Sequence, residues 1–195
     1  LKMDQENNNT FWHDAIQKEM ENVKVAFKPL EDDEKLPVGY KEITCHMNFE
    51  VKMDLRRKAR YVAGGHLTDP PTSMTYSSVV SRESVRMAFL IAALNDLDVL
   101  AGDIQNAYLN APTKEKLYIK GGPEWGKYEG KRILIVRALY GLESSGKQWR
   151  MDLADKLQST MGFKSCLADP DVWFKPMTKP DGRKYYAYIL LASIR

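Results

Sequence analysis

Asp103 is the residue whose type and position in this sequence could support chemistry. It closes the apolar run from Leu97 to Ala101 within LDVLAGDIQNAYLNAP, residues 97–112. An ionised carboxylate at the end of a buried strand is costly in free energy unless a partner balances its charge, and a divalent cation does so well. Alternatively, the short side chain bonds to its own backbone and caps the next turn, which is the more frequent role for an isolated aspartate. Position alone leaves both readings open.

Basic residues gather in KMDLRRKAR, residues 52–60, where five cations stand against one acid. The formal net charge of the whole chain is only +3, so overall charge does not indicate a nucleic-acid partner. A solvated hairpin is the ordinary explanation of such a run. In a strand, alternation would place Lys58 and Arg60 on one face, with Ala59 and Tyr61 on the other.

The strands that must position the basic residues are predicted from the alternation of apolar and polar residues. Residues 43–53, ITCHMNFEVKM, alternate between apolar and polar at every step, which predicts a strand with one buried face. The turn DLRR, residues 54–57, leads into KARYVAG, residues 58–64, as the returning strand. The basic cluster is therefore expected at the tip and on the second strand of a hairpin.

The remaining elements complete a mixed fold. Helices are predicted over 11–23, 82–96 and 145–162, with Thr10 and Ser81 as N-caps and Gly162 at a C-terminal cap. Further strands are predicted at 98–103, 116–120, 132–139, 171–175 and 185–191. Pro180-Asp181-Gly182 is expected to turn the last two into a hairpin. This order predicts an α+β fold, with a mostly antiparallel sheet packed against helices.

The bulk properties narrow the class of protein. The 195 residues are 44% hydrophobic and 28% charged, which is ordinary for a soluble globular domain. Cys45 and Cys166 match no metal-binding spacing and favour reduced thiols over a disulfide framework. The apolar runs are far shorter than the ~20 residues of a membrane span, so no membrane partner is expected. A start without Met and an end inside an apolar run indicate a fragment of a longer chain.

Five motifs resemble those of the reverse transcriptases of copia-type (Pseudoviridae) retrotransposons. GDIQNAYLNAP resembles the family's first catalytic motif, in which a strand-end Asp is followed by Ala-Phe or Ala-Tyr, Leu, and Asn or His. The other four stretches are KARYVAGGH, TYSSVVSRESVRMAFLIAA, RALYGLESSGKQWR and GFKSCLADPDVWF. Each motif alone has little specificity. The five occur in the family's order across nearly the whole chain, from about residue 11 to residue 191, and together they are specific.

The resemblance implies an RNA-directed DNA polymerase that transfers nucleotides with two Mg²⁺ ions. By the family pattern, Asp103 would be the first catalytic metal ligand, assisted by the backbone carbonyl of Ile104. Tyr108 would be the aromatic steric gate, a flat ring under the incoming sugar that disfavours a 2′-hydroxyl. An ordinary core aromatic is the alternative for Tyr108.

The resemblance also implies contacts to the incoming nucleotide. Lys58 and Arg60 match the fingers residues that contact its triphosphate. Tyr140 and Gly141 match the loop that packs under the template base and the nucleotide that pairs with it. Glycine would allow the backbone to approach a base more closely than any side chain permits.

Contacts to the template and primer are implied for Ser144, Ser145 and Lys147. The sequence departs from the most common family pattern here, because Ser144, Gly146 and Lys147 stand where Gln, Pro and Arg are usual. We interpret the departure as a trait of a subgroup. Trp149, in the same motif, is expected to anchor a helix in the core rather than to contact a ligand.

The implied fold is that of reverse transcriptase fingers and a partial palm. Residues 1–40 would be an N-terminal helix and link, 41–80 the fingers hairpin and loop, and 81–195 the partial palm. The family continues from a strand like YYAYILL into Tyr-Val-Asp-Asp, whereas this sequence reads ASIR at 192–195. A lone aspartate cannot hold two Mg²⁺ ions tightly, since each ion needs several oxygen ligands. The 195-residue polypeptide is therefore expected to lack polymerase activity on its own.

The implied partners are an RNA or DNA template-primer, deoxynucleoside triphosphates, and the integrase and RNase H of a Pol polyprotein. The implied location is intracellular, in a cytoplasmic virus-like particle or the nucleus. The alternatives are a fragment that binds nucleic acid without catalysis and the product of a decayed element.

Overall fold

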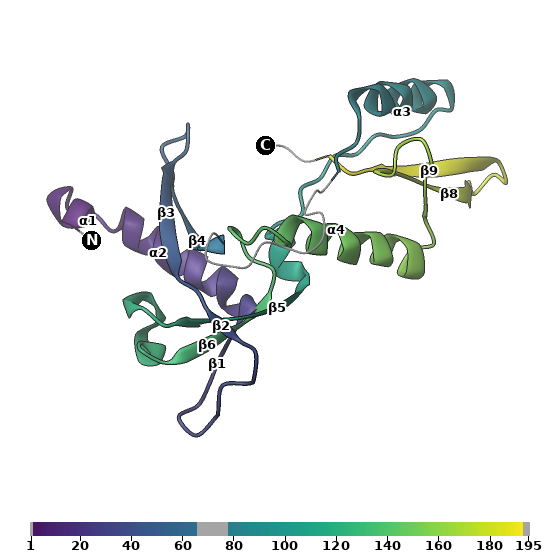
Figure 1. The fold of residues 1–195 in the computed structure, drawn as a ribbon. Coiled ribbons are helices and arrows are strands. Elements are labelled where there is room, and N and C mark those ends of the chain that lie inside the picture. Colours follow the sequence, from purple (N-terminus) through teal and green to yellow (C-terminus); the bar gives the residue numbers. More distant parts are fainter. Residues whose placement is uncertain (1, 66–77, 193–195) are drawn as a thin grey trace. The chain divides into compact units, whose positions relative to one another are not determined.

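In the computed structural model, which describes residues 2–65 and 78–192, the chain divides into two units. The first unit takes Leu1–Thr75 and Asn106–Trp149, and the second takes Tyr76–Gln105 and Arg150–Arg195. Both units combine helices with mostly antiparallel sheets, which confirms the predicted α+β class (Figure 1). No helix within the described ranges is long and apolar enough to cross a membrane.

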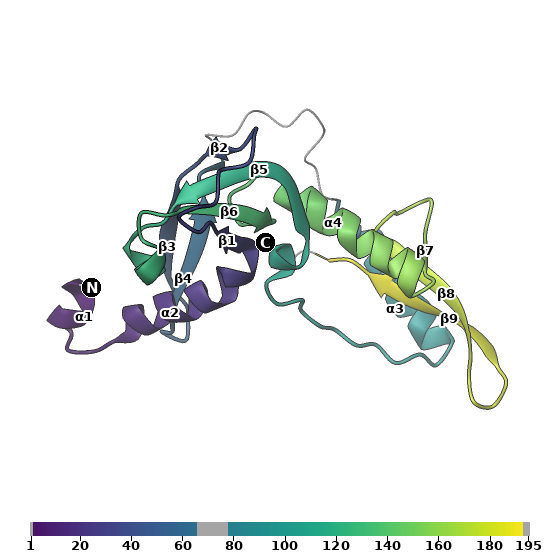
Figure 2. The same ribbon diagram turned by 90° about the horizontal axis from the view of Figure 1, so that it is seen from below.

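The centre of the first unit is a four-stranded sheet in the order β1-β6-β5-β2 (Figure 2). Its strands are β1 (Phe27–Pro29), β6 (Arg132–Arg137), β5 (Pro112–Lys120) and β2 (Lys41–Glu42). β6 pairs antiparallel with β1 and β5, whereas the short β2 pairs parallel with β5. Ile119, Ile133 and Ile135 are at most 1% exposed, because the β-branched side chains of β5 and β6 form the middle of the core.

The predicted basic hairpin is confirmed as β3 (Cys45–Val51) and β4 (Arg57–Ala63), which pair antiparallel. The helix α2 (Phe11–Val23) packs against β4, and Ala59 and Tyr61 are buried there. The predicted buried face of the first strand is only partly buried, since Phe49 and Val51 are about half exposed near the hairpin tip. At that end the Phe49 and Trp12 rings pack nearly perpendicular to each other, with their centres 5.2 Å apart.

Asp4, rather than the predicted Thr10, caps α2. Thr10 is the residue before the helix, but its hydroxyl donates to the Asp14 carboxylate at 2.9 Å instead of accepting an amide. Asp4 lies in the short helix α1 (Lys2–Glu6), and its two carboxylate oxygens accept the amides of Trp12 and His13 at 3.1 and 2.9 Å. The carboxylate is 5% exposed, so these charge-assisted bonds compensate for its burial.

Short helical turns connect the strands of the first unit. The turns are η1 (Lys24–Ala26), η3 (Ala107–Asn110) and η4 (Pro123–Tyr128). Trp125 of η4 packs into the core, where its ring nitrogen donates to the Tyr61 hydroxyl at 3.0 Å. This bond ties the basic hairpin to the main sheet.

The second unit holds the sheet β7-β8-β9 and two helices. Its strands are β7 (Lys164–Ser165), β8 (Val172–Thr178) and β9 (Lys184–Leu190), all antiparallel. α3 (Arg82–Leu94) precedes the sheet in sequence. α4 (Ser145–Asp155) begins in the first unit and continues through the π-helical turn η5 (Lys156–Thr160). Leu157, Phe163 and Trp173 form the small core.

Two predicted helix caps and one predicted turn of the second unit are confirmed. The Ser81 hydroxyl accepts the amide of Ser84 at 3.1 Å and so caps α3. Gly162 follows the last helical turn with φ +72°. Gly182, with φ +85°, completes the turn between β8 and β9. Both glycines adopt the left-handed region, in which a Cβ is unfavourable.

The predicted strand at 98–103 is wrong. These residues have no regular structure, and Val99 and Leu100 are 56% and 93% exposed. A strand is stable only beside a hydrogen-bonded neighbour, and no described strand pairs with this segment. The premise that Asp103 ends a buried strand is wrong as well.

Candidate functional site

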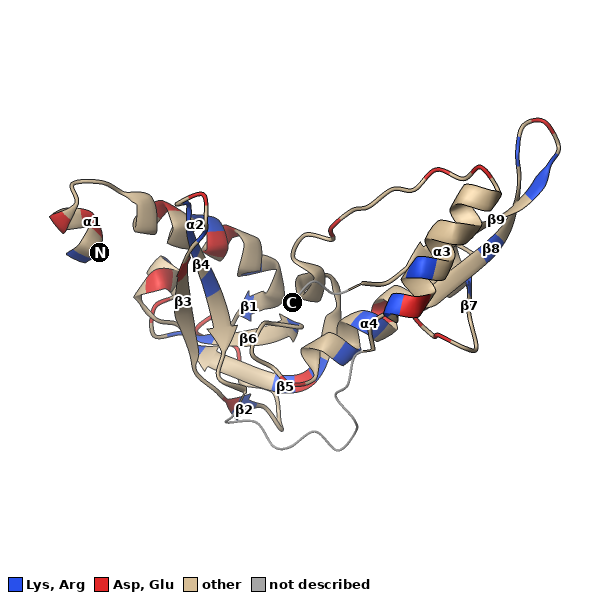
Figure 3. Ribbon diagram, turned by 90° about the horizontal axis from the view of Figure 1, so that it is seen from above, with Lys and Arg blue, Asp and Glu red and all other residues tan. Residues whose placement is uncertain are grey.

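Lys58 and Arg60 lie on the solvent-facing side of β4. Their neighbours Ala59 and Tyr61, on the opposite side, are 4% and 2% exposed. Alternation along the strand therefore separates the two cations from the core, as the sequence predicted. Figure 3 shows basic residues along the hairpin of β3 and β4, with acidic residues between them.

Arg60 lies beside two aromatic rings. Its guanidinium carbon is 5.9 Å from the centre of the Tyr140 ring, within the range of a cation–π contact. The Tyr140 and Tyr108 rings are 5.0 Å apart with a tilt of 52°. Tyr108 and Tyr140 are both half-buried. A cation next to two partly exposed rings can contact a phosphate and a planar or ribose group together.

The short helix η3 sets the place of Tyr108. The backbone carbonyls of Leu109 and Asn110 accept from the Arg137 guanidinium at 3.2 and 3.3 Å. Leu109 is 4% exposed and anchors the turn in the core. Because Arg137 ends β6, the main sheet holds the turn that presents Tyr108.

Gly141 meets the backbone of β4. The residue has φ +95°, and a Cβ added to it would lie 2.0 Å from the Ala63 carbonyl oxygen. The amide of Ala63 donates to the Tyr140 carbonyl at 2.8 Å. Gly65 makes the reciprocal approach, since its Cβ would lie 2.0 Å from the Gly141 carbonyl oxygen. These contacts require glycine at 141 for packing within the protein, apart from any contact with a base.

The serines after this loop have partners inside the first unit. Ser145 is 1% exposed, and its hydroxyl donates to the Leu139 carbonyl at 2.6 Å and accepts the Leu139 amide at 3.0 Å. The Ser144 hydroxyl bonds to the Glu115 carboxylate and accepts from Gln148 at 2.7 Å. Lys147 lies half-buried on the first turn of α4.

Asp103 and Ile104 belong to the second unit and are both exposed. No hydrogen bond or ion pair joins the Asp103 carboxylate to another described residue, so it does not cap the following turn. Across residues 2–65 and 78–192, no three Asp, Glu, His or Cys side chains gather closely enough to hold a metal ion. The residues that the structure brings together are Arg60, Tyr108, Tyr140 and Gly141, all in the first unit.

Sequence reasoning missed Glu50. Its Oε1 lies 2.7 Å from the Lys52 ammonium, and its Oε2 lies 3.4 Å from the Arg60 guanidinium. The hydrogen bond from Lys52 and the nearby positive charges hold the pKa of Glu50 below its usual value. The predicted hairpin contained the signal, because the alternation that exposes Arg60 also exposes Glu50 on the neighbouring strand.

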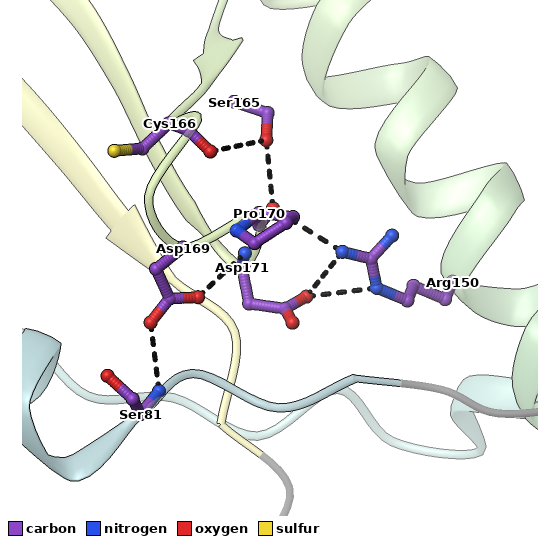
Figure 4. Close-up of polar contacts among 7 residues, drawn as sticks. All are labelled: Ser81, Arg150, Ser165, Cys166, Asp169, Pro170 and Asp171. Atoms are coloured by element: carbon purple, nitrogen blue, oxygen red, sulfur yellow. Dashed lines mark hydrogen bonds and ion pairs between the residues drawn. The ribbon is translucent and has the colours of Figure 1, made fainter.

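A second polar cluster, in the second unit, was also missed. Arg150 bonds through Nε and Nη2 to one oxygen of Asp171, at 2.9 and 2.7 Å (Figure 4). Asp171 is 1% exposed. The nearby Asp169 accepts the Ser84 hydroxyl at 2.6 Å and the Ser81 amide at 2.9 Å, which lowers its pKa to about 2. The turn of Asp169 and Asp171 therefore connects α3, α4 and β8.

Comparisons with known proteins agree with the sequence motifs. Residues 32–178 match the family model described as reverse transcriptase (RNA-dependent DNA polymerase). The chain is 30% identical over 173 residues to the retrovirus-related Pol polyprotein from transposon TNT 1-94 of Nicotiana tabacum, an alignment that covers 83% of the chain and 13% of that protein.

Yeast relatives match a shorter stretch. The transposon Ty1-BL Gag-Pol polyprotein of Saccharomyces cerevisiae is 37% identical over 118 residues, which is 60% of this chain and 7% of that protein. The truncated transposon Ty1-A Gag-Pol polyprotein of the same yeast is also 37% identical over 118 residues. The chain thus spans 7–13% of the length of these curated relatives. No solved structure matches it.

Proposed function

This chain belongs to the reverse transcriptase (RNA-dependent DNA polymerase) family, and we propose that it supplies the fingers and part of the palm of a copia-type enzyme. The observation that best supports a nucleotide-binding role is the contact series of Arg60, Tyr140 and Tyr108. In this proposal residues 1–40 are the N-terminal helix and link, 41–80 the fingers hairpin and loop, and 81–195 the partial palm. Residues 66–77 of the loop lie outside the described residues.

We assign the triphosphate, the sugar and the base of the nucleotide to residues of that contact series and its neighbours. Lys58 and Arg60 bind the triphosphate, because a guanidinium fork and an ammonium group match phosphate oxygens. Tyr108 packs under the sugar as the steric gate. Tyr140 and the backbone at Gly141 contact the base, and the close packing of Gly141 on β4 keeps Tyr140 beside Arg60.

Ser144, Ser145 and Lys147 are assigned to the template and primer. Lys147 would contact a backbone phosphate from the first turn of α4. Ser145 contributes indirectly, since its buried hydroxyl fixes Leu139, the residue before Tyr140. Ser144 must exchange the Glu115 carboxylate for a nucleic-acid group if it is to make a direct contact.

Mg²⁺ binding is assigned to the Asp103 carboxylate and the Ile104 carbonyl. An exposed carboxylate without a protein partner among the described residues is suited to a hard cation. The same residues do not fit a complete two-metal site, because no three Asp, Glu, His or Cys side chains gather to hold a metal ion in the described ranges. The 195-residue polypeptide is therefore expected to bind nucleotides without polymerising them.

The proposed setting follows from the relatives, whose printed names are those of Pol and Gag-Pol polyproteins. The chain would act beside the integrase and RNase H of such a polyprotein, on an RNA or DNA template-primer, in a cytoplasmic virus-like particle or the nucleus.

Nucleotide binding is the decisive test. A fluorescent deoxynucleoside triphosphate is titrated with the 195-residue chain and with Arg60→Ala and Lys58→Ala variants. Loss of one charge-assisted phosphate contact, worth about 1.5–3 kcal/mol, should weaken binding about 10- to 100-fold. Lys28→Ala is the control, because Lys28 is an exposed cation that pairs with Glu34, away from the hairpin. Equal affinity of wild type and Arg60→Ala would refute the assignment.

Primer extension tests the expectation that the 195-residue polypeptide lacks polymerase activity. The polypeptide is incubated with a primed RNA template, deoxynucleotides and Mg²⁺ or Mn²⁺, and no extension is expected. Extension that disappears in an Asp103→Asn variant would show that these 195 residues suffice for catalysis, and would contradict the expectation.

A further inference from the structure

Glu50 lies among the cations of the basic hairpin. Its two carboxylate oxygens take different partners, Lys52 at 2.7 Å and Arg60 at 3.4 Å. In the register of β3 and β4, Glu50 is also the residue directly opposite Lys58. One carboxylate thus lies next to Lys52, Lys58 and Arg60.

These side chains are accessible to a ligand. The Glu50, Lys52 and Arg60 side chains are 45%, 39% and 40% exposed, respectively. An ion pair with that exposure is weak and exchanges readily with solvent or with another anion. The cations can therefore change partners without any change in the fold.

Glu19, Glu124 and Asp54 also lie near the hairpin, and each accepts a hydrogen bond from a hairpin residue other than Arg60. Glu19 of α2 accepts the backbone amide of Tyr61 at 2.9 Å, at the edge of β4. Asp54 sits in the turn at the hairpin tip and binds Arg56 at 2.6 Å. Glu19 also attracts Lys58 and Arg60 electrostatically, but among the described carboxylates Glu50 is the one with an oxygen within ion-pair distance of Arg60.

A carboxylate and a phosphate bind a guanidinium through the same kind of contact, with anionic oxygens accepting from its N–H groups. A phosphate chain that approaches this face must take the Arg60 and Lys52 donors away from Glu50. The negative charge of Glu50 also repels the phosphate chain while the carboxylate stays beside these cations. The carboxylate therefore opposes binding of a polyanion to these cations.

We propose that Glu50 is an internal competitor for phosphate, which occupies Arg60 and Lys52 in the free protein and yields them to a triphosphate. Lys52 becomes a third phosphate contact beside Lys58 and Arg60. This inference rests on the proposed nucleotide-binding role of the hairpin.

The test measures affinity for inorganic tripolyphosphate, a probe of phosphate recognition without a base or sugar. Calorimetric titrations in a buffer without divalent cations compare wild type with Glu50→Gln, which keeps the shape of the side chain and removes its charge. Binding should become about two- to fivefold tighter, the range expected when a competing exposed ion pair is removed. The gain should shrink as salt is raised, because salt screens the competing charge.

Glu34→Gln is the matched control. Glu34 is a 41% exposed carboxylate that pairs with Lys28 at 3.6 Å, so its replacement changes net charge by the same amount away from the hairpin. Its affinity for tripolyphosphate should equal that of the wild type. An equal gain in both variants would show a general charge effect and overturn the proposal, as would unchanged or weaker binding by Glu50→Gln.

An Arg60→Ala variant separates this inference from the proposed function. If Arg60→Ala binds tripolyphosphate as well as wild type, the hairpin is not the phosphate site and the proposed function fails with it. If Arg60→Ala weakens binding while Glu50→Gln has no effect, only the competitor role fails. In the double variant, most of the gain from Glu50→Gln should disappear, because the cation that Glu50 occupies is gone.

Discussion

The contact between Gly141 and β4 predicts a large loss of stability for Gly141→Ala. The added Cβ would lie 2.0 Å from the Ala63 carbonyl oxygen and 2.7 Å from a Val62 methyl carbon. The backbone of β4 cannot retreat freely, because the Ala63 amide donates to the Tyr140 carbonyl at 2.8 Å. The substitution must therefore separate the loop from the strand or distort both.

The expected magnitude has three contributions. A non-glycine residue in the left-handed region costs about 1–2 kcal/mol. Overpacking in a well-packed region typically costs about 1–3 kcal/mol. A broken backbone hydrogen bond adds about 0.5–1.5 kcal/mol. Since these contributions overlap, we expect a total of about 3–5 kcal/mol, a large part of the ~5–15 kcal/mol that stabilises a typical domain.

Urea unfolding followed by far-UV circular dichroism measures the effect. Gly130→Ala is the control, because Gly130 has φ +75° and no heavy atom lies within 4 Å of its added Cβ. That variant should lose only the backbone contribution, about 1–2 kcal/mol. Gly65→Ala should show the overpacking contribution without the backbone one, since its Cβ would meet the Gly141 carbonyl at 2.0 Å but its φ is not positive. Equal losses in Gly141→Ala and Gly130→Ala would refute the role of the contact with β4.

Three further predictions concern carboxylates. Arg150→Met should lower the free energy of unfolding by about 2–4 kcal/mol in urea titrations, because it leaves the 1% exposed Asp171 without its cation; a loss below ~1 kcal/mol would contradict this. The folded-state pKa of Asp169 is lowered to about 2, so its contribution to stability is present above its ordinary pKa near 3.8 and disappears as the pH falls toward 2. Asp169→Asn should therefore be less stable than wild type at pH 7, and the difference should shrink as the pH falls from 3.8 through 2, whereas a difference independent of pH would count against the linkage. Asp4→Ala should destabilise α2 by about 0.5–2 kcal/mol and speed hydrogen exchange of the two amides that Asp4 accepts, and unchanged exchange would exclude the cap.

Alternation and helical periodicity were enough to predict most elements. The helix over residues 11–23 and the hairpins of β3–β4 and β8–β9 follow from patterns within a dozen residues. The separation of Lys58 and Arg60 from the core follows in the same way. These features depend on which faces of a short segment are apolar, and this local pattern is already present before the tertiary structure forms.

The cap of α2 and the close contact at Gly141 depended on partners that the local sequence pattern does not identify. Thr10 has the right type and place for an N-cap, yet the carboxylate that caps α2 comes from Asp4. The need for glycine at 141 comes from Ala63, which is remote in sequence and adjacent in space. No local pattern predicts such a pair, because the distance between the two backbones is set by the packing of a whole unit.

The candidate site also combines features that the sequence predicts with features that depend on tertiary structure. The sequence by itself determined the family, through five ordered motifs, and the face on which Lys58 and Arg60 lie. Only the tertiary structure placed Tyr108 against Tyr140 and Glu50 against Arg60. It also left Asp103 in an exposed segment that pairs with none of the described strands. The reason is physical: residue types and their order record chemistry and local periodicity, whereas strand pairing and side-chain contacts require partners from elsewhere in the chain.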